Sequence, residues 1–288
     1  MKILFAISLF LLTLNSGIIN TNHNLSTTGS GSIKASSEQE ICIFCHTPHH
    51  TRPQGTPLWN RSMPASAYTM YDSEYLRRFN YPMPTALGSD NGTPGAISRQ
   101  CLSCHDGTVA VGSVYIVRGT ILGETLIDMV GLTAGMMTSA NTGYIGTDLS
   151  VHHPVGIQYS TTPTVSFGVG TRNMELKATP DSPIKLYDYS GTKYVECSSC
   201  HDPHKENAKF LHVDSGANHA QNAVTTCTAC HSKDNWTGSI HQTATATYSD
   251  AAVTTKYGTN IVSDLGCINC HTPHNGEGKP YLLRQTQA

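Results

Sequence analysis

Residues 197–204 read CSSCHDPH, in which two cysteines stand three apart, a histidine follows the second directly, and another histidine comes three residues later. Near-copies occupy residues 42–49 (CIFCHTPH) and 267–274 (CINCHTPH). Shorter versions without the trailing histidine occupy residues 101–105 (CLSCH) and 227–231 (CTACH). The chain thus contains five CxxCH units, which we number 1 to 5 in chain order, and they use all ten cysteines.

The spacing of these units suits the covalent attachment of haem. One helical turn puts two residues three apart on the same face, where each thiol can form a thioether to one of the two haem vinyl groups. The following histidine then lies beneath the iron, and CxxCH is the signature of c-type haem attachment. Zinc sites and thioredoxin-like sites also use CxxC, and ten cysteines could form a disulfide framework. None of these alternatives needs a histidine after every second cysteine, so the sequence predicts five covalently attached c-type haems.

This interpretation assigns fifteen residues directly. The predicted thioether residues are Cys42, Cys45, Cys101, Cys104, Cys197, Cys200, Cys227, Cys230, Cys267 and Cys270. The predicted proximal iron ligands are His46, His105, His201, His231 and His271.

Composition predicts an irregular fold. Only 13% of the residues are charged, against about 25% in a typical soluble domain, and Ser, Thr, Gly and Asn are abundant. We therefore expect a loop-rich, haem-packed chain with little regular secondary structure, namely short helices at the haem sites and a few short strands. The formal charge of −2 omits the haem propionates, which Lys and Arg would partner, and gives no reason to expect nucleic acid.

The first residues predict export. Lys2 precedes an apolar run at residues 3–14, and small residues follow at 15–17, as in a secretory signal peptide cleaved near Gly17. The alternative is an N-terminal core helix. The run is too short to cross a bilayer and no similar segment follows, so we expect no transmembrane segment. We expect an extracellular or periplasmic protein, because c-type haem is attached outside the cytoplasm.

The rest of the chain, 18–288, is expected to form one pentahaem domain. Residues 18–40 are polar and predict an N-terminal arm outside the core. Residues 106–196 form an insert without attachment units, in which 109–117 and 157–159 predict short strands. Residues 197–288 hold three units, which predicts a dense segment of haem, short helices and loops.

Distal ligands are expected among the remaining histidines. The trailing His49, His204 and His274 each lie three residues beyond a proximal histidine, a reach of at most roughly 10 Å. That distance cannot carry the chain to the opposite face of the same haem, so each is predicted to bind a neighbouring haem. The alternative role for each is at the surface or beside a propionate.

Three further histidines complete the distal candidates, which are six for five haems. His153 belongs to the long insert and precedes Pro154, which restricts its backbone. His241 lies between units 4 and 5, and His23 lies in the arm, where a solvated histidine is the alternative. We expect surface positions, or positions beside the ligands, for His50, His152, His212 and His219. Methionine could serve as a distal ligand, but the surplus of histidine favours bis-histidine iron with no open position.

The units with trailing histidines resemble the paired-CxxCH class of multihaem cytochromes. The resemblance extends to HNLS at 23–26, ICIFCHTPH at 41–49, CLSCHDGT at 101–108 and HPVG at 153–156. These phrases resemble exported multihaem cytochromes of bacteria that respire on external acceptors. In some relatives that polymerise into extracellular filaments, an N-terminal histidine of one subunit ligates a haem of the next, and His23 is similar in position.

Two classes of function follow. The first is electron conduction through closely spaced haems, in a filament of copies of this chain or in a discrete carrier that meets other redox proteins. The second is a multihaem reductase, which needs an exposed iron and often has lysine in place of a proximal histidine. Because all five units end in histidine, we expect an electron-transfer protein, with no catalytic residues.

Overall fold

The computed structural model describes residues 17–49, 51, 58–90, 92–117, 120–161, 165–167, 170–172, 174–216, 218–249, 251–277 and 281–284. The predicted signal peptide lies outside these residues except for Gly17, and so does His50. Within the described part of the chain, no helix has the length and apolar character needed to cross a bilayer.

The helices are short. The α-helices are α1 (Glu74–Arg78), α2 (Ala96–His105), α3 (Cys197–Cys200), α4 (His219–Cys230), α5 (Ile240–Thr243), α6 (Ala251–Tyr257) and α7 (Val262–Leu265). The 3-10 helices are η1 (Gly17–Asn20), η2 (Cys42–Phe44), η3 (Leu149–Val151), η4 (Ala208–Phe210) and η5 (Gly266–Asn269).

The strands form small antiparallel sheets. β1 (Lys34–Ala35) pairs with β4 (Met129–Val130), β2 (Ser113–Val117) with β3 (Thr120–Leu126), and β6 (Val165–Phe167) with β7 (Gly170–Arg172). β9 (Thr192–Val195) lies between β5 (Ile157–Gln158) and β8 (Tyr187–Tyr189). The strands expected at 109–117 and 157–159 are present as β2 and β5. With 26% helix and 14% strand, the loop-rich fold class is confirmed.

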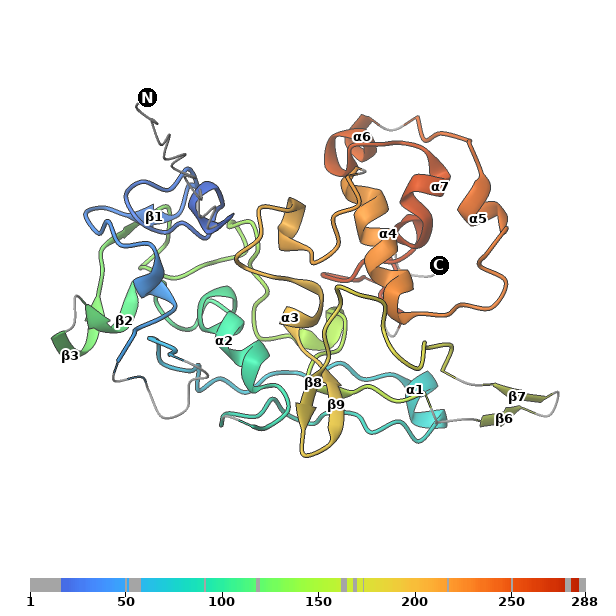
Figure 1. Cartoon of the computed structure of the whole chain (residues 1–288), viewed down its shortest axis with the longest axis horizontal. Helices are drawn as coiled ribbons and strands as arrows, with labels where there is room; N and C mark the ends of the chain where they lie inside the picture. The colour runs from blue at the N-terminus through green and yellow to red at the C-terminus, as the bar shows by residue number, and fades with distance from the viewer. Residues whose placement is uncertain are drawn as a thin grey trace, which may run out of the picture.

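The attachment units follow one another along the molecule. Figure 1 shows β1, β2 and β3 at one end, α2 and α3 in the middle, and α4 to α7 at the other end. Unit 1 contains η2, units 2 and 4 end helices α2 and α4, unit 3 contains α3, and unit 5 overlaps η5. Chain order therefore corresponds to order along the long axis for the three units whose helices are labelled (Figure 1).

Apolar side chains form several small clusters. The largest cluster has eight buried members, Leu25, Ala35, Ile43, Phe44, Val111, Val114, Ile127 and Met137. A second cluster joins Leu87, Leu102 and Leu149, and the two others lie within residues 184–268. Each cluster lies next to an attachment unit, so the units are positioned by local packing.

The expectation of an arm at residues 18–40 outside the core is wrong. Leu25 and Ala35 belong to the largest cluster, and Asn24 and Ser26 are completely buried. The polar side chains satisfy one another, since the Ser26 hydroxyl donates to Asn24 Oδ1 at 2.7 Å. The Ala35 N–H also donates to the Leu25 carbonyl at 2.8 Å. Polar composition therefore predicts exposure poorly here, because these side chains bond internally.

Candidate haem-attachment centres

Each attachment unit forms one helical turn. In units 1, 3, 4 and 5 the N–H of the terminal histidine donates to the carbonyl of the first cysteine, at 2.8, 3.2, 2.9 and 3.0 Å. Unit 2 makes the last turn of α2. All ten cysteines are free, so the disulfide framework considered above is not formed. The turn brings both thiols and the histidine of a unit together, as covalent haem attachment requires.

A second backbone segment pairs with the histidine in four of the units. These antiparallel bridges are His46 with Trp59, His201 with Leu211, His231 with Leu176, and His271 with Leu283. The residue before each partner has a positive φ, namely Leu58 (65°), Phe210 (59°), Glu175 (49°) and Leu282 (52°). Such a φ is uncommon outside glycine and carries strain. Sequence reasoning missed these bridges, because the partner residue lies at a different distance along the chain in each unit.

Backbone carbonyls orient three of the five proximal imidazoles. Nδ1 of His105 lies 2.7 Å from the Gly143 carbonyl, Nδ1 of His201 2.8 Å from that of Lys209, and Nδ1 of His271 2.8 Å from that of Tyr281. A carbonyl can only accept, so Nδ1 carries the proton and Nε2 has a free lone pair. This is how proteins usually fix a metal-binding histidine.

Four proximal histidines each face one distal candidate. The ring centroids are 6.1 Å apart for His46 with His204, 6.1 Å for His105 with His23, 6.1 Å for His201 with His274, and 6.3 Å for His231 with His153. Two imidazoles that bind one metal from opposite sides, with bonds of about 2 Å, would have centroids roughly 6 Å apart. The spacing of these four pairs fits an iron between them.

The trailing histidines of units 3 and 5 lie against other units. His204 faces the proximal histidine of unit 1, and His274 faces that of unit 3. His152, which is buried, lies beside His274 with their Nδ1 atoms 3.2 Å apart. The structure thus places His204 and His274 away from their own units, while their ligation of iron stays a prediction.

His23 is held inside its own chain. Its ring stacks on Phe210 with centroids 4.3 Å apart, and its Nδ1 is buried with no hydrogen-bond partner. Burial, with the charge of His105 as the next cause, lowers the pKa of His23 to about 4. The ring is therefore neutral at physiological pH, which is the state that binds metal.

Unit 5 has no described imidazole opposite its proximal histidine. His49 and His241, the other two distal candidates, are both exposed, and no ring contact joins either to His271 within the described residues. His241 lies on α5, which packs against α7 and η5. His212 bonds through Nε2 to the Ser198 carbonyl at 2.9 Å, and His219 begins α4.

A buried carboxylate joins units 2 and 3. Glu196, only 1% exposed, accepts hydrogen bonds from the backbone N–H groups of Gly95 and Ser98 and from the hydroxyls of Ser98 and Tyr189. The first two donors are at the N-terminal end of α2, where a negative charge is favoured. Burial raises the pKa of Glu196, and these hydrogen bonds oppose the rise. Sequence reasoning missed Glu196, because a single Glu before a cysteine carries no pattern.

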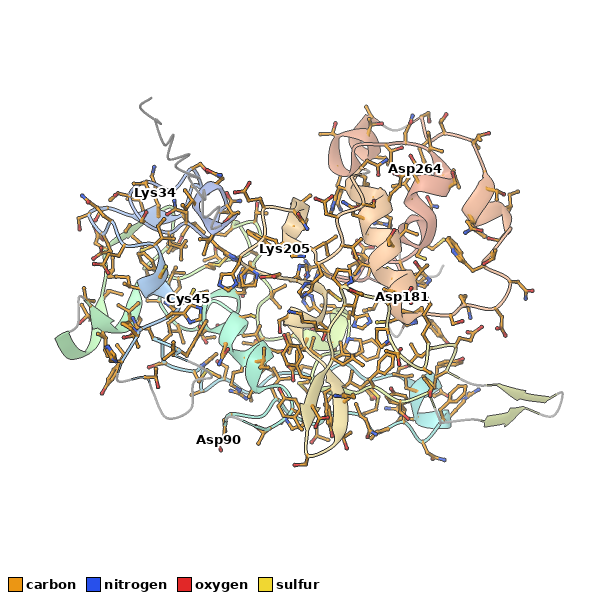
Figure 2. The ribbon with its side chains drawn as sticks, in the orientation of Figure 1. Lys34, Cys45, Asp90, Asp181, Lys205 and Asp264 are labelled. Atoms are coloured by element: carbon orange, nitrogen blue, oxygen red, sulfur yellow. The ribbon has the colours of Figure 1, made fainter. Side chains whose placement is uncertain are left out.

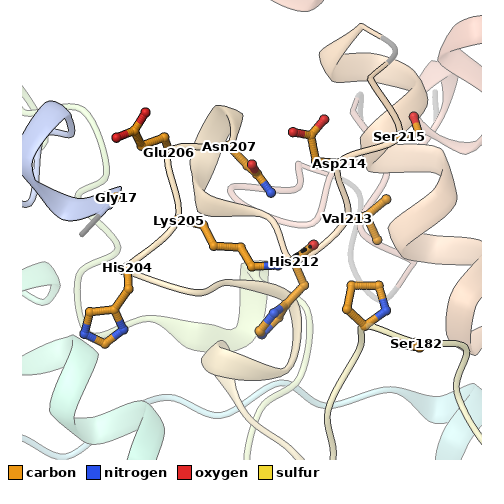
Figure 3. A pocket seen from close by; sticks show the side chains of 11 residues that line it. Gly17, Ser182, His204, Lys205, Glu206, Asn207, His212, Val213, Asp214 and Ser215 are labelled. Atoms are coloured by element: carbon orange, nitrogen blue, oxygen red, sulfur yellow. Dashed lines mark hydrogen bonds between the residues drawn. The ribbon is translucent and has the colours of Figure 1, made fainter. Parts of the chain in front are cut away.

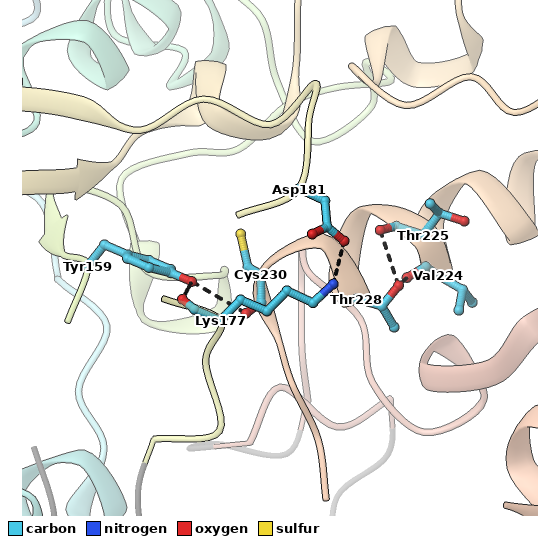
Figure 4. Close-up of polar contacts among 7 residues, drawn as sticks. All are labelled: Tyr159, Lys177, Asp181, Val224, Thr225, Thr228 and Cys230. Atoms are coloured by element: carbon cyan, nitrogen blue, oxygen red, sulfur yellow. Dashed lines mark hydrogen bonds and ion pairs between the residues drawn. The ribbon is translucent and has the colours of Figure 1, made fainter. Parts of the chain in front are cut away.

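A tyrosine fixes the end of unit 4. The Tyr159 hydroxyl donates to the Lys177 carbonyl at 2.7 Å and lies 3.4 Å from the Cys230 carbonyl (Figure 4). The Lys177 N–H also donates to the Cys230 carbonyl at 2.8 Å. An ion pair between the Lys177 and Asp181 side chains holds the same segment. The insert therefore contributes directly to the fixation of this unit.

An open cavity lies next to His204. It has a volume of about 670 Å³ and is lined by His204, Lys205, His212 and Asp214 among others (Figure 3). This volume is within the range of cofactor and small-molecule sites. Lys205 donates from Nζ to the His212 carbonyl at 3.1 Å. The lining also includes the carboxylate side chains of Glu206 and Asp214 and none of the ten cysteines, so this cavity is not itself an attachment site.

Cysteines of consecutive units lie close together. The thiols of Cys101 in unit 2 and Cys197 in unit 3 lie close enough to shift each other's pKa, and so do those of Cys227 in unit 4 and Cys267 in unit 5. Cys45 likewise lies near enough to Cys104 for their charges to interact. Figure 2 shows Cys45 toward the β1–β3 end, Lys205 near the middle, and Asp181 and Asp264 toward the helical end. The units form a close series in chain order.

A comparison with known families agrees with this geometry. A family model described as the doubled CXXCH motif matches residues 192–235, which contain units 3 and 4. No curated protein matches the chain. The motif supports covalently bound c-type haem and a multihaem c-type cytochrome class, for which electron transfer is the indicated role.

Proposed function

We propose that this chain is a pentahaem c-type cytochrome that conducts electrons through closely spaced bis-histidine haems outside the cytoplasm. The signal peptide would end near Gly17, and residues 18–288 would form one domain. The observation that carries the proposal is the set of four imidazole pairs with centroids 6.1 to 6.3 Å apart. In each pair one ring belongs to a CxxCH unit and the other to a different part of the chain.

Each facing pair of histidines would hold one haem iron between its two rings. We assign His204 to the iron of unit 1, His23 to unit 2, His274 to unit 3 and His153 to unit 4. When bound, each haem supplies a reversible one-electron change at its iron. The protein would attach the haem through cysteine, fix the imidazole tautomer through backbone carbonyls in units 2, 3 and 5, and hold the iron with a second histidine.

The short link between the two histidines of one unit sets the haem spacing. His201 would bind the iron of unit 3 while His204 binds that of unit 1, and three residues span at most roughly 10 Å. His271 and His274 would link units 5 and 3 in the same way. Close spacing of this kind supports electron conduction along the row.

The same series supports a polymer. The trailing histidine of unit 5 faces unit 3, and that of unit 3 faces unit 1. His49, the trailing histidine of unit 1, is exposed, and unit 5 needs a distal ligand. We propose that His49 of one copy binds the iron of unit 5 in the next. This contact is heterologous, so its repetition produces an open filament if the rotation does not close a ring.

This proposal changes the role of His23. The resemblance to filament-forming relatives suggested it as the donor to a neighbouring copy, because it lies near the N-terminus. Its ring faces His105 of its own chain and stacks on Phe210, so it is better suited to the iron of unit 2. The donor is then the exposed trailing histidine of unit 1.

A discrete carrier is the second candidate, and one contact favours it. His241 lies on α5, which packs against η5 of unit 5, so this histidine could ligate unit 5 within one chain. Partners would then be other redox proteins instead of further copies. If neither histidine bound, the open iron would favour a reductase.

Matched variants separate these candidates. If the polymer forms as proposed, His49→Ala should abolish filaments in negative-stain images and convert one ferric haem in five to high spin. His241→Ala should then leave both properties unchanged. A high-spin haem only in His241→Ala would establish the carrier, and one high-spin haem in the unaltered protein would establish the open iron.

A further inference from the structure

Arg61 is a completely buried cation that contacts only uncharged acceptors. Its exposed fraction is 0%. Nε donates to the Ser103 hydroxyl at 3.1 Å, and Nη2 donates to the carbonyls of Ser103 and Ala110, each at 2.9 Å. Nη1 donates to the Val111 carbonyl. No carboxylate within the described residues pairs with it. Arginine remains charged in proteins, so the site holds an uncompensated positive charge.

This charge lies between units 1 and 2. Ser103 is the residue before Cys104 in unit 2, and Arg61 bonds to both its hydroxyl and its carbonyl. The preceding residue, Asn60, donates from Nδ2 to the carbonyl of Ile43 in unit 1 at 2.7 Å. It is also completely buried. Two consecutive side chains therefore fasten the first two units together.

The field of Arg61 reaches both units. Burial is the main cause that lowers the pKa of His105, and the Arg61 charge lowers it further, whereas the hydrogen bond to the Gly143 carbonyl and the Asp106 charge raise it. Burial raises the pKa of Cys45 to about 12, while the same charge opposes that rise. The buried carboxylate that follows unit 2, Asp106, accepts instead from Tyr68 and Thr108. The Arg61 charge therefore acts on the proximal histidine of unit 2, His105, and on an attachment cysteine of unit 1, Cys45.

We propose that Arg61 sets the reduction potentials of the haems at units 1 and 2, making them the most positive of the five. A fixed cation stabilises an added electron, and it does so more strongly where the surroundings are buried and screening is weak. The inference rests on haem attachment at these units and does not require polymerisation. In the proposed series of haems, the Arg61 charge means that an electron entering at unit 5 would reside preferentially at the unit 1 end.

The test is a spectroelectrochemical titration of the haem-loaded protein. Arg61→Gln removes the charge and keeps a hydrogen-bonding side chain. We expect the two haems that titrate at the most positive potentials, which give two-fifths of the absorbance change, to titrate at more negative potentials in this variant. The control Arg77→Gln removes an exposed arginine of α1 that pairs with Asp72, and it should leave the curve unchanged.

A second variant keeps the test decisive if Arg61→Gln does not fold. Ser103→Asp places a carboxylate where Nε of Arg61 now donates, so it should neutralise the field and shift the same haems to more negative potentials. An unchanged curve in either fully loaded variant would overturn the inference. The haem content of each protein is counted in parallel. Fewer than five haems in the unaltered protein would contradict the proposed function instead.

Discussion

The imidazole of His23 lies 6.1 Å from that of His105, centroid to centroid, with the ring planes at 72°. His23 lies shortly after η1, and His105 is the last residue of α2. The buried Nδ1 of His23 has no hydrogen-bond partner. This relationship joins the N-terminal segment to the second attachment unit. It is the basis for treating His23 as a ligand within its own chain.

His23→Ala should therefore leave one haem in five without a distal ligand in every assembly state. We expect a high-spin ferric signal from one haem in dispersed protein as well as in any filament, measured by electronic absorption and EPR. His212→Ala is the matched control, because Nε2 of His212 is already bonded to the Ser198 carbonyl at 2.9 Å. Five low-spin haems in dispersed His23→Ala would contradict the assignment.

The ring angles predict two classes of low-spin iron. The pairs at units 1 and 3 are closer to parallel, at 19° and 33°, whereas those at units 2 and 4 are closer to perpendicular, at 72° and 76°. Two iron d orbitals can interact with the π systems of the imidazoles. Parallel imidazoles interact with the same one of these orbitals and separate the two in energy. Perpendicular imidazoles interact with one orbital each and leave the two nearly equal in energy. EPR of the ferric protein should show rhombic and highly anisotropic signals together.

Single substitutions assign these signals to units. His204→Ala should remove one rhombic signal, because His204 faces His46 of unit 1. His274→Ala should remove another, because His274 faces His201 of unit 3. His212→Ala should remove neither, since His212 bonds to the Ser198 carbonyl. Loss of a highly anisotropic signal in His204→Ala would show that the pairing is different.

Glu196→Ala should be strongly destabilising. The substitution removes the acceptor for two buried N–H groups and two hydroxyls, and we expect a loss of roughly 2–4 kcal/mol in the free energy of unfolding. Chemical denaturation of the haem-loaded protein measures it. Glu74→Ala, which removes an exposed ion pair with Arg78, should cost less than about 1 kcal/mol.

Glu196 should also make stability depend on pH. Burial raises its pKa in the folded protein above the ordinary value of 4.5, so the folded state binds its proton more tightly than the unfolded state. Its contribution is therefore fully present below pH 4.5 and is lost as pH rises through the folded pKa. Glu196→Gln should flatten the stability profile in that window, and an unchanged profile would show that the carboxylate titrates normally.

Haem removal should abolish the fold. Its apolar clusters in the described residues have between three and eight buried members, which is little core for a chain of 288 residues. We expect the chain made without haem attachment to lack a cooperative thermal transition in circular dichroism. A cooperative transition in that material would mean that the clusters suffice.

Much of the fold class and the attachment chemistry could be predicted from the chain. The strands β2 and β5 fall within the segments 109–117 and 157–159, where the sequence predicted short strands, and each unit forms the single turn that its spacing implies. The arm at 18–40 was wrongly expected to lie outside the core, because polarity suggested exposure while Asn24 and Ser26 bond to each other in the interior.

The sequence by itself determined which cofactor the units suit and which residues would attach it, because that chemistry lies within five consecutive residues. It also determined that His204 and His274 cannot reach the far side of their own haems, because reach depends only on chain length. Only the tertiary structure decided which histidine faces which unit, where His23 lies, and that Arg61 and Glu196 are buried between units. These relationships join residues far apart in the chain, and no local spacing fixes the packing that brings them together.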